Sequence, residues 1–214
     1  MAATPAEFVR AHTRLGVVPD VPEIRLHLAG DVFDLWEQME LDLGRPGLPP
    51  PFWAVVWAGG QVLARYLLDH PGTVAGRTVL DLASGCGLVA IAAARAGAAA
   101  VTANEIDRYA IAAIALNSVA NDVTVTAVSG DVLDDDPPDV AVVLAGDVCY
   151  DRTMTGRVLS FLERARASGA QVLLGDPGRA YLPRDGFEAL ATYEIAVARV
   201  EGVAVRHSTV WRLP

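Results

Sequence analysis

An acid followed by a glycine-rich turn is the first feature of this sequence that could bind a ligand. In the segment Val79-Leu80-Asp81-Leu82-Ala83-Ser84-Gly85-Cys86-Gly87, a strand-like run ends at Asp81 and a turn follows. Ligands of doubly wound α/β sheets bind beyond the carboxyl ends of the strands. Glycines there let the backbone approach closely, and the next helix offers free N–H groups. We expect Asp81, Ser84, Gly85 and Gly87 to bind a cofactor.

The acid of this segment indicates the kind of cofactor. The third glycine of the dinucleotide fingerprint is replaced by Ala90, a substitution that fingerprint tolerates. A carboxylate at Asp81 would repel a pyrophosphate but would accept a hydrogen bond from an α-ammonium group. S-adenosylmethionine (SAM) carries an ammonium and a carboxylate on its methionine end, so the pattern favours SAM over a dinucleotide.

Two more acids follow the next predicted strands. Glu105 comes eighteen residues after Gly87, where a carboxylate can hold both ribose hydroxyls. The alternative is a solvated acid or a helix cap, a role that Asp107 could also fill. Asp131 could accept a hydrogen bond from the adenine amine, or could simply be a turn aspartate.

The segment Gly146-Asp147-Val148-Cys149-Tyr150 follows a fourth predicted strand, which we expect to lie beside the first. That order would place Asp147 and Tyr150 next to a transferred methyl group. Methyl transfer is an in-line displacement, so the protein mainly aligns the nucleophile. A carboxylate can orient a neutral amine and stabilise the cation that forms. The alternative is a helix cap by Asp147 or Asp151 beside a packed tyrosine.

Strands and helices must alternate to position these residues. An uninterrupted apolar run is typical of a strand buried on both faces. The alternation predicts a Rossmann-like, seven-stranded, mostly parallel α/β sheet with helices on both faces and an antiparallel C-terminal hairpin. The predicted strands cover residues 78–82, 100–103, 123–128, 140–145, 171–174, 191–200 and 204–212; the predicted helices cover 59–69, the stretch ending at Arg95, 109–120, 152–167 and a short piece near 185–190.

Residues 1–50 differ in pattern from residues 51–214, which we expect to form the catalytic domain. A short helix is predicted over 5–15, a half-buried strand through Ile24, Leu26 and Leu28, and a helix over 31–41 capped by Asp31. The proline-rich residues 44–51 must form a loop. This N-terminal extension could serve as a lid or as a substrate-docking element.

Composition excludes several classes of function. The chain has 214 residues, 52% hydrophobic, and a net charge of 17 − 26 = −9. An acidic chain disfavours nucleic acid and anionic membranes as partners. It would favour a cationic substrate, such as a lysine-bearing protein, but a negative charge that serves solubility alone is the simpler explanation. Cys86 and Cys149 form no metal-ligand set with the histidines, so no metal is expected. They could form a redox pair. The simpler interpretation is that both are small buried side chains of a protein in a reducing cytoplasm.

These residues together resemble a known family. The stretch from Asp81 to Gly87, with Glu105 and Asp131, resembles the SAM-binding motifs of class I methyltransferases, and Asp147-x-x-Tyr150 resembles the D-x-x-Y signature of the family-16 protein methyltransferases. Three more stretches resemble the lysine methyltransferases that act on the β-subunit of electron-transfer flavoprotein, and their bacterial relatives: Pro51 to Gln61, Leu174 to Arg179 and Ser208 to Trp211.

The resemblance implies roles for further residues. By it, Trp57 and Gly59-Gly60 line the cofactor pocket, and Asp147 and Tyr150 line the target amine pocket. Asp176, Pro177 and Arg179 would shape the substrate side. Two positions depart from the family: Ala58 replaces a usual proline, and Cys149 replaces a usual aromatic residue. The second departure would widen the amine pocket.

The sequence therefore predicts a cytoplasmic SAM-dependent N-methyltransferase that modifies a protein lysine. The resemblance makes the electron-transfer flavoprotein β-subunit the leading substrate. The expected cofactor-binding residues are Trp57, Gly59, Asp81, Ser84, Gly85, Gly87, Glu105, Asp131 and Asp147; the expected catalytic residues are Asp147 and Tyr150. Two alternatives stay open: methylation of a small amine, and binding of SAM or a nucleotide without catalysis.

Overall fold

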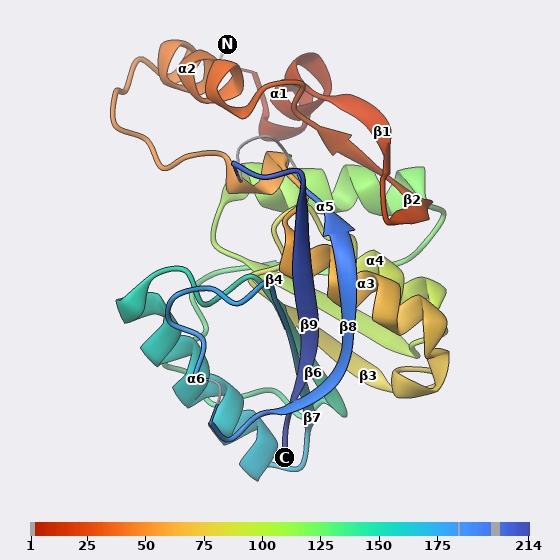
Figure 1. Ribbon diagram of the computed structural model, residues 1–214. Helices are drawn as coiled ribbons and strands as arrows, with labels where there is room; N and C mark the ends of the chain where they lie inside the picture. The colour runs from red at the N-terminus through yellow and green to blue at the C-terminus, as the bar shows by residue number, and fades with distance from the viewer. Residues whose placement is uncertain (1–2, 184, 198–201) are drawn as a thin grey trace.

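A seven-stranded sheet forms the centre of the computed structural model, which describes residues 3–183, 185–197 and 202–214 (Figure 1). The strand order is β5-β4-β3-β6-β7-β9-β8. The first five are parallel and the last two antiparallel, which confirms the predicted fold class, including the pairing of β3 with β6. The strands are β3 (Thr78–Leu82), β4 (Ala100–Glu105), β5 (Thr126–Ser129), β6 (Val142–Gly146), β7 (Gln171–Asp176), β8 (Glu188–Ala196) and β9 (Val205–Leu213).

Helices cover both faces of this sheet, and alternate strand residues point to each face. Val79 and Val142 belong to the core formed with α3 (Ala58–Asp69), α4 (Leu88–Arg95) and part of α5 (Arg108–Ala120). Their neighbours Leu80 and Val143 pack instead against α6 (Arg152–Ala167) on the opposite face. The period of two residues in a strand places successive side chains on opposite faces of the sheet.

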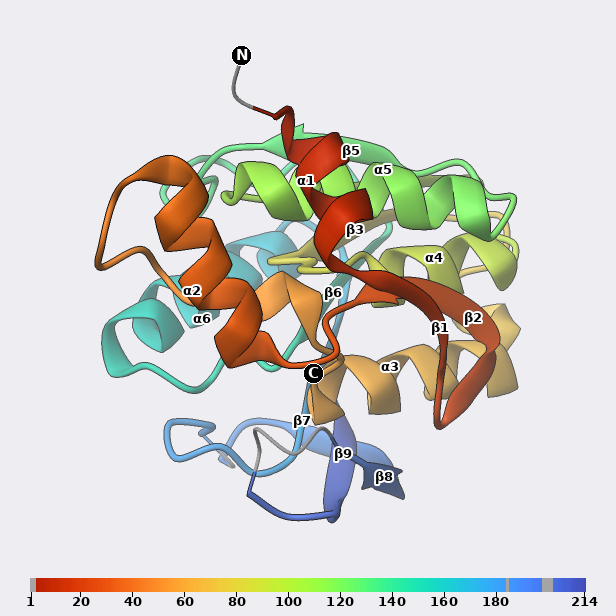
Figure 2. The ribbon, with the colours of Figure 1, turned by 90° about the horizontal axis from the view of Figure 1, so that it is seen from above.

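The N-terminal extension contains a helix, a hairpin and a second helix: α1 (Pro5–His12), β1 (Arg14–Val18), β2 (Val21–Leu28) and α2 (Val32–Leu43). These elements lie together on one side of the molecule, next to α5 (Figures 1 and 2). Val21, Ile24 and Leu26 are fully buried in the same core as α3 and α4. Hence the extension shares the hydrophobic core of the sheet.

Asn117 of α5 and Asn121, the residue that follows this helix, dock the free edge of β2. Asn121 Oδ1 accepts a hydrogen bond from the Arg25 N–H at 3.0 Å, and its Nδ2 donates to the Arg25 carbonyl at 2.6 Å. Asn117 Oδ1 accepts from the His27 N–H at 2.7 Å, and its Nδ2 donates to the Cys86 carbonyl at 2.8 Å. Because the other edge of β2 pairs with β1, these amides satisfy backbone groups that would otherwise lack a partner.

The structure corrects several predicted boundaries. No helix forms near 185–190: Gly186 has a left-handed backbone (φ +90°), and β8 begins at Glu188. Residues 198–200 of the predicted strand 191–200 lie outside the described ranges. The predicted helix 5–15 ends at His12, and β1 follows it; β1 is mostly exposed and lacks the alternation that would have revealed it. Asp31 caps α2 as predicted.

Within the described ranges, no helix combines the length and apolar character that crossing a bilayer requires.

Three glycines, Gly59, Gly146 and Gly175, let the start of α3 lie directly on the sheet. Gly59 and Gly60 of α3 face Gly146 of β6 and Gly175 of β7. A Cβ on Gly175 would overlap the Gly59 carbonyl oxygen and would lie 2.9 Å from Leu63 Cβ. Close backbone contact of this kind is open only to residues without a side chain.

We expect Gly175→Ala to lower the free energy of unfolding by about 3 kcal/mol or more, because both partners of the new methyl group are rigid. Gly156→Ala is the matched control: it lies within α6 with nothing near its Cβ position, and we expect a gain of about 0.5–1 kcal/mol. Urea unfolding of both variants checks this. Equal stabilities would contradict the close-packing account.

Candidate functional site

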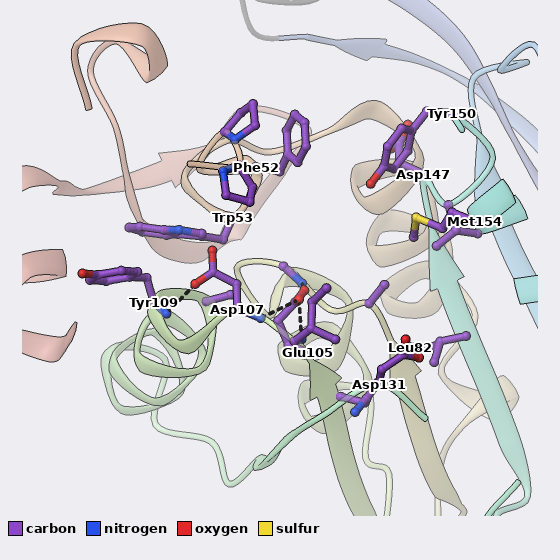
Figure 3. A pocket seen from close by; sticks show the side chains of 18 of the residues that line it. Phe52, Trp53, Leu82, Glu105, Asp107, Tyr109, Asp131, Asp147, Tyr150 and Met154 are labelled. Carbon is purple, nitrogen blue, oxygen red and sulfur yellow. Dashed lines mark hydrogen bonds between the residues drawn. The ribbon is translucent and has the colours of Figure 1, made fainter. Parts of the chain in front are cut away.

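A cavity of about 790 Å³ lies at the carboxyl ends of β3, β4 and β6, where an α/β sheet is expected to bind its ligand (Figure 3). One wall comes from the extension, through Met39, Leu43 and Leu48. Of the residues expected to bind the cofactor or act in catalysis, six line this cavity: Trp57, Gly85, Glu105, Asp131, Asp147 and Tyr150. The structure thus brings together acids from the ends of β4, β5 and β6, beside Gly85 from the turn after β3.

The turn after β3 is held from behind by Asp81. This residue is 1% exposed, and its Oδ2 accepts hydrogen bonds from the Ser84 hydroxyl and, at 3.0 Å, from the Ala90 N–H. Gly87 caps α4 with φ +84°, and a Cβ there would lie 3.2 Å from Ile114. Asp81, Ser84 and Gly87 therefore shape the turn without lining the cavity, which differs from the direct contact between Asp81 and an ammonium group that the sequence suggested.

Burial raises the pKa of Asp81 to about 7, against the hydrogen bonds from Ser84 and Ala90 that lower it. The folded protein therefore binds a proton at Asp81 more readily than the unfolded chain, whose carboxyl has a pKa of about 4. Linkage makes this contribution to stability complete below about pH 4 and lost as the pH rises through about 7.

We expect the free energy of unfolding of the wild type to fall more steeply between pH 5 and pH 8 than that of Asp81→Asn, whose side chain is neutral throughout. Urea unfolding at four pH values measures both slopes. Asp136→Asn, which removes an exposed acid, is the control and should follow the wild type. Parallel curves for the wild type and Asp81→Asn would contradict the account.

Glu105 connects this turn to the end of β4. Its Oε2 accepts from the Gly85 N–H at 2.9 Å, and its Oε1 accepts from the Ile106 N–H at 2.7 Å and the Asp107 N–H at 3.3 Å (Figure 3). The carboxylate is thereby fixed on the cavity wall with both oxygens oriented. Asp107 caps α5 through the Tyr109 N–H at 2.7 Å, as the sequence suggested.

Asp131 has structural partners as well as a place in the cavity wall. Its Oδ1 accepts from the Leu133 N–H at 3.1 Å, the bond of a turn aspartate, and its Oδ2 pairs with Arg157 at 2.9 Å. The Arg157 guanidinium holds the pKa of Asp131 below its usual value. The turn role considered from the sequence is therefore present, and Arg157 is a cavity residue that the sequence did not point to.

Asp147 is the most heavily bonded side chain of the cavity. Its Oδ2 accepts from the Gly59 N–H and, at 3.2 Å, from the Gly60 N–H, both at the start of α3. Its Oδ1 accepts from Arg179 Nε at 2.9 Å and Nη2 at 2.7 Å. Asp147 thus caps α3 from another strand, where Trp57 provides no side-chain cap. Gly59 serves this contact and does not line the cavity.

An aromatic group forms the cavity wall beside Asp147. The Phe52 ring lies 5.8 Å from Trp57 and 5.9 Å from Tyr150, centroid to centroid. The Trp57 indole N–H donates to the Phe52 carbonyl at 2.9 Å. Burial, together with the nearby carboxylates of Glu105 and Asp151, raises the pKa of Tyr150, so its phenol stays neutral at physiological pH. Phe52 escaped the sequence analysis as a site residue, although it belongs to the stretch that carried the resemblance.

A second aromatic pair lies at the other side of the cavity. Trp53 stacks on Tyr109, with ring centroids 6.5 Å apart and an interplanar angle of 16° (Figure 3). The Trp53 indole nitrogen is buried and has no hydrogen-bond partner among the described residues. Trp53 is 2% exposed, so its ring packs with Tyr109 beneath this side of the cavity.

The two cysteines are buried and free. Burial raises the pKa of both the Cys86 and the Cys149 thiol to about 12, so neither is a thiolate at physiological pH. This confirms the interpretation of both as small buried side chains. Among the described residues, no group of three or more histidine, cysteine, aspartate or glutamate side chains is arranged to hold a metal ion.

The profile of a family described as lysine methyltransferase matches residues 50–185. The electron transfer flavoprotein beta subunit lysine methyltransferase of Xenopus laevis is 36% identical over 98% of this chain and 87% of its own length. The chain belongs to the lysine methyltransferase family.

Solved structures of other methyltransferases have a similar fold. A putative RNA methyltransferase from Pyrococcus horikoshii matches with a TM-score of 0.59 at 19% identity, covering 82% of this chain and 96% of its own. The magnesium protoporphyrin IX methyltransferase of Synechocystis, solved with S-adenosylhomocysteine (SAH), matches with a TM-score of 0.55 at 17% identity, covering 85% of this chain and 94% of its own. The protein is a SAM-dependent methyltransferase.

The cavity fits SAM by the chemistry of its walls. Gly85 presents a backbone without a side chain, and Glu105 presents two fixed carboxylate oxygens. The lining also includes the hydrogen-bond donors Arg45 and Arg108 and the aromatic rings of Phe52 and Trp57. SAM needs acceptors for its ribose hydroxyls and ammonium group, a donor for its acidic end or ring nitrogens, and flat apolar surface for its base. The methyltransferase provides each of these within one cavity.

Proposed function

We propose that this enzyme transfers a methyl group from SAM to the ε-amine of a lysine in the β-subunit of electron transfer flavoprotein. One observation carries the proposal: the Glu105–Gly85 contact and the Asp147–Tyr150 group lie on the same cavity. On this proposal, a nucleoside site would adjoin an amine site. The substrate is suggested by the frog relative, which is named for this activity and aligns with nearly the whole chain.

We assign the cofactor side to Trp57, Gly85, Glu105 and Asp131. Glu105 would accept from the two ribose hydroxyls, since its position is fixed by backbone N–H groups. Asp131 would accept from the adenine amine. The residues behind the turn, Asp81, Ser84, Gly87 and Gly59, would act through the backbone that they hold.

Asp147 and Tyr150 would flank the target amine, with Phe52 beside them. When bound, SAM supplies an electrophilic methyl group. The chain would contribute alignment and exclusion of water: the aromatic rings of Phe52 and Trp57 would form an apolar wall beside the lysine side chain, and the neutral Tyr150 phenol could hydrogen-bond the nitrogen. The extension would close the cavity from the other side through Met39 and Leu43.

We expect Glu105→Ala to lower the affinity for SAM at least tenfold, on the order of 1.4 kcal/mol, because charge-assisted contacts are lost. Glu163→Ala, on an exposed position of α6, is the matched control and should bind as the wild type. Calorimetry with SAM and with SAH measures both. Wild-type affinity in Glu105→Ala would remove Glu105 from the cofactor site.

We expect purified enzyme, SAM and recombinant electron transfer flavoprotein β-subunit to give a methylated lysine, detected by mass spectrometry of a digest. Tyr150→Phe should retain SAM affinity and lose at least tenfold in turnover, because the amine loses a hydrogen-bond partner. An unmodified subunit, with methyl transfer to a small amine instead, would show that the substrate is not a protein.

A further inference from the structure

The pairing of Asp147 with Arg179 determines the charge beside the proposed amine site. The two side chains are 8% and 19% exposed, and both residues line the cavity. The Arg179 guanidinium also lies over the Trp57 ring, 5.7 Å from its centroid. The Arg179 backbone N–H donates to Asp176 Oδ1 at 2.6 Å, which fixes the loop after β7. Arg179 is therefore held from three directions.

A lysine must lose its proton before its nitrogen can accept a methyl group. The ordinary pKa of a lysine side chain is about 10.4, so the ammonium form dominates in water. An unpaired carboxylate within about 4–6 Å would stabilise the ammonium and raise that pKa by about 1–3 units. A carboxylate alone would therefore hold the substrate in its unreactive form.

We propose that Arg179 is a positioning residue that keeps the target amine neutral by cancelling the charge of Asp147. The inference rests on the proposed function. With Arg179 in place, the pair presents no net charge, and the lysine gives its proton to water. Its lone pair then forms the bond to carbon as the carbon–sulfur bond breaks, and the positive charge passes from sulfur to nitrogen. Because Asp147 is already paired, the methylated cation is not trapped there.

Other ionisable groups also face the cavity, from β4, α5, α6 and the loops after α2, β5 and β6. They are Arg45, Glu105, Asp107, Arg108, Tyr150 and the Asp131–Arg157 pair. Asp176 lies behind Arg179, and its burial raises its pKa. All of them are the same in the wild type and in variants of the pair, so differences between pH profiles report on Asp147 and Arg179.

The test is the pH dependence of kcat between pH 6.5 and 10, at saturating SAM and β-subunit. We expect Arg179→Gln to shift the acidic limb of the kcat profile to higher pH by about one unit. At pH 7 kcat would then fall about tenfold, and the loss would be recovered at high pH. Asp147→Asn should move the limb in the opposite direction. Arg179→Lys, which keeps the charge, should retain the position of the wild-type limb. Calorimetry with SAM confirms that each variant is folded.

A second measurement does not require turnover or the β-subunit. The enzyme saturated with SAH is titrated with n-butylamine, a mimic of the lysine side chain, in two buffers of different ionisation enthalpy at pH 8. We expect release of about one proton per amine bound by the wild type, because most of the free amine is protonated at this pH, and release near zero in Arg179→Gln.

The outcomes separate the two proposals. A wild type that leaves the β-subunit unmodified overturns the substrate assignment, while the butylamine titration still decides the role of Arg179. Equal losses of kcat at every pH in Arg179→Gln would assign Arg179 a structural role only and overturn the inference. Butylamine uptake without proton release in the wild type would overturn it as well.

Discussion

The carboxylate of Asp147 is the contact on which the arrangement of this enzyme depends. It joins the start of α3, the end of β6 and the loop after β7 through hydrogen bonds to Gly59, Gly60 and Arg179. Its own backbone is left-handed (φ +57°), a conformation that aspartate adopts more readily than most residues. The hydrogen bonds to both carboxylate oxygens hold the residue in this conformation and offset its strain. The Asp147 side chain therefore fixes the positions of α3, of the Arg179 guanidinium and of this part of the cavity wall.

The same contact explains why glycines gather at this end of the sheet. A helix whose N–H groups reach a carboxylate on the neighbouring strand must lie almost on the strand backbone. Gly59, Gly146 and Gly175 remove the side chains that would keep the two apart. Gly59, which the resemblance placed in the cofactor pocket, thus allows α3 to pack closely on the sheet.

Much of the fold could be predicted from the sequence, because strongly periodic segments report directly on burial. The apolar run of β6 and the alternation in β2 gave correct elements, and helix 152–167 was predicted at its observed boundaries. The short exposed β1 and the start of β8 could not be predicted, since their formation depends on pairing with distant strands.

The site was predictable in its members more than in their roles. Acids at strand ends converge on one edge of the sheet by topology alone, which is why Glu105, Asp131 and Asp147 could be named. Whether a carboxylate faces a ligand or supports the backbone depends on partners far along the chain, such as Arg179 for Asp147 and Ala90 for Asp81. The wall contributed by Met39 and Leu43 carries no chemical signature, so sequence reasoning did not find it.

The Asn117 amide gives the extension a mechanical connection to the turn after β3. One of its atoms is bonded to the backbone of β2 and the other to the Cys86 carbonyl within the turn. Asn117 is fully buried, so neither bond can be exchanged for water without displacing a packed element. The hairpin and the turn therefore share one buried anchor, and a displacement of either element would leave a polar group of Asn117 unsatisfied inside the protein.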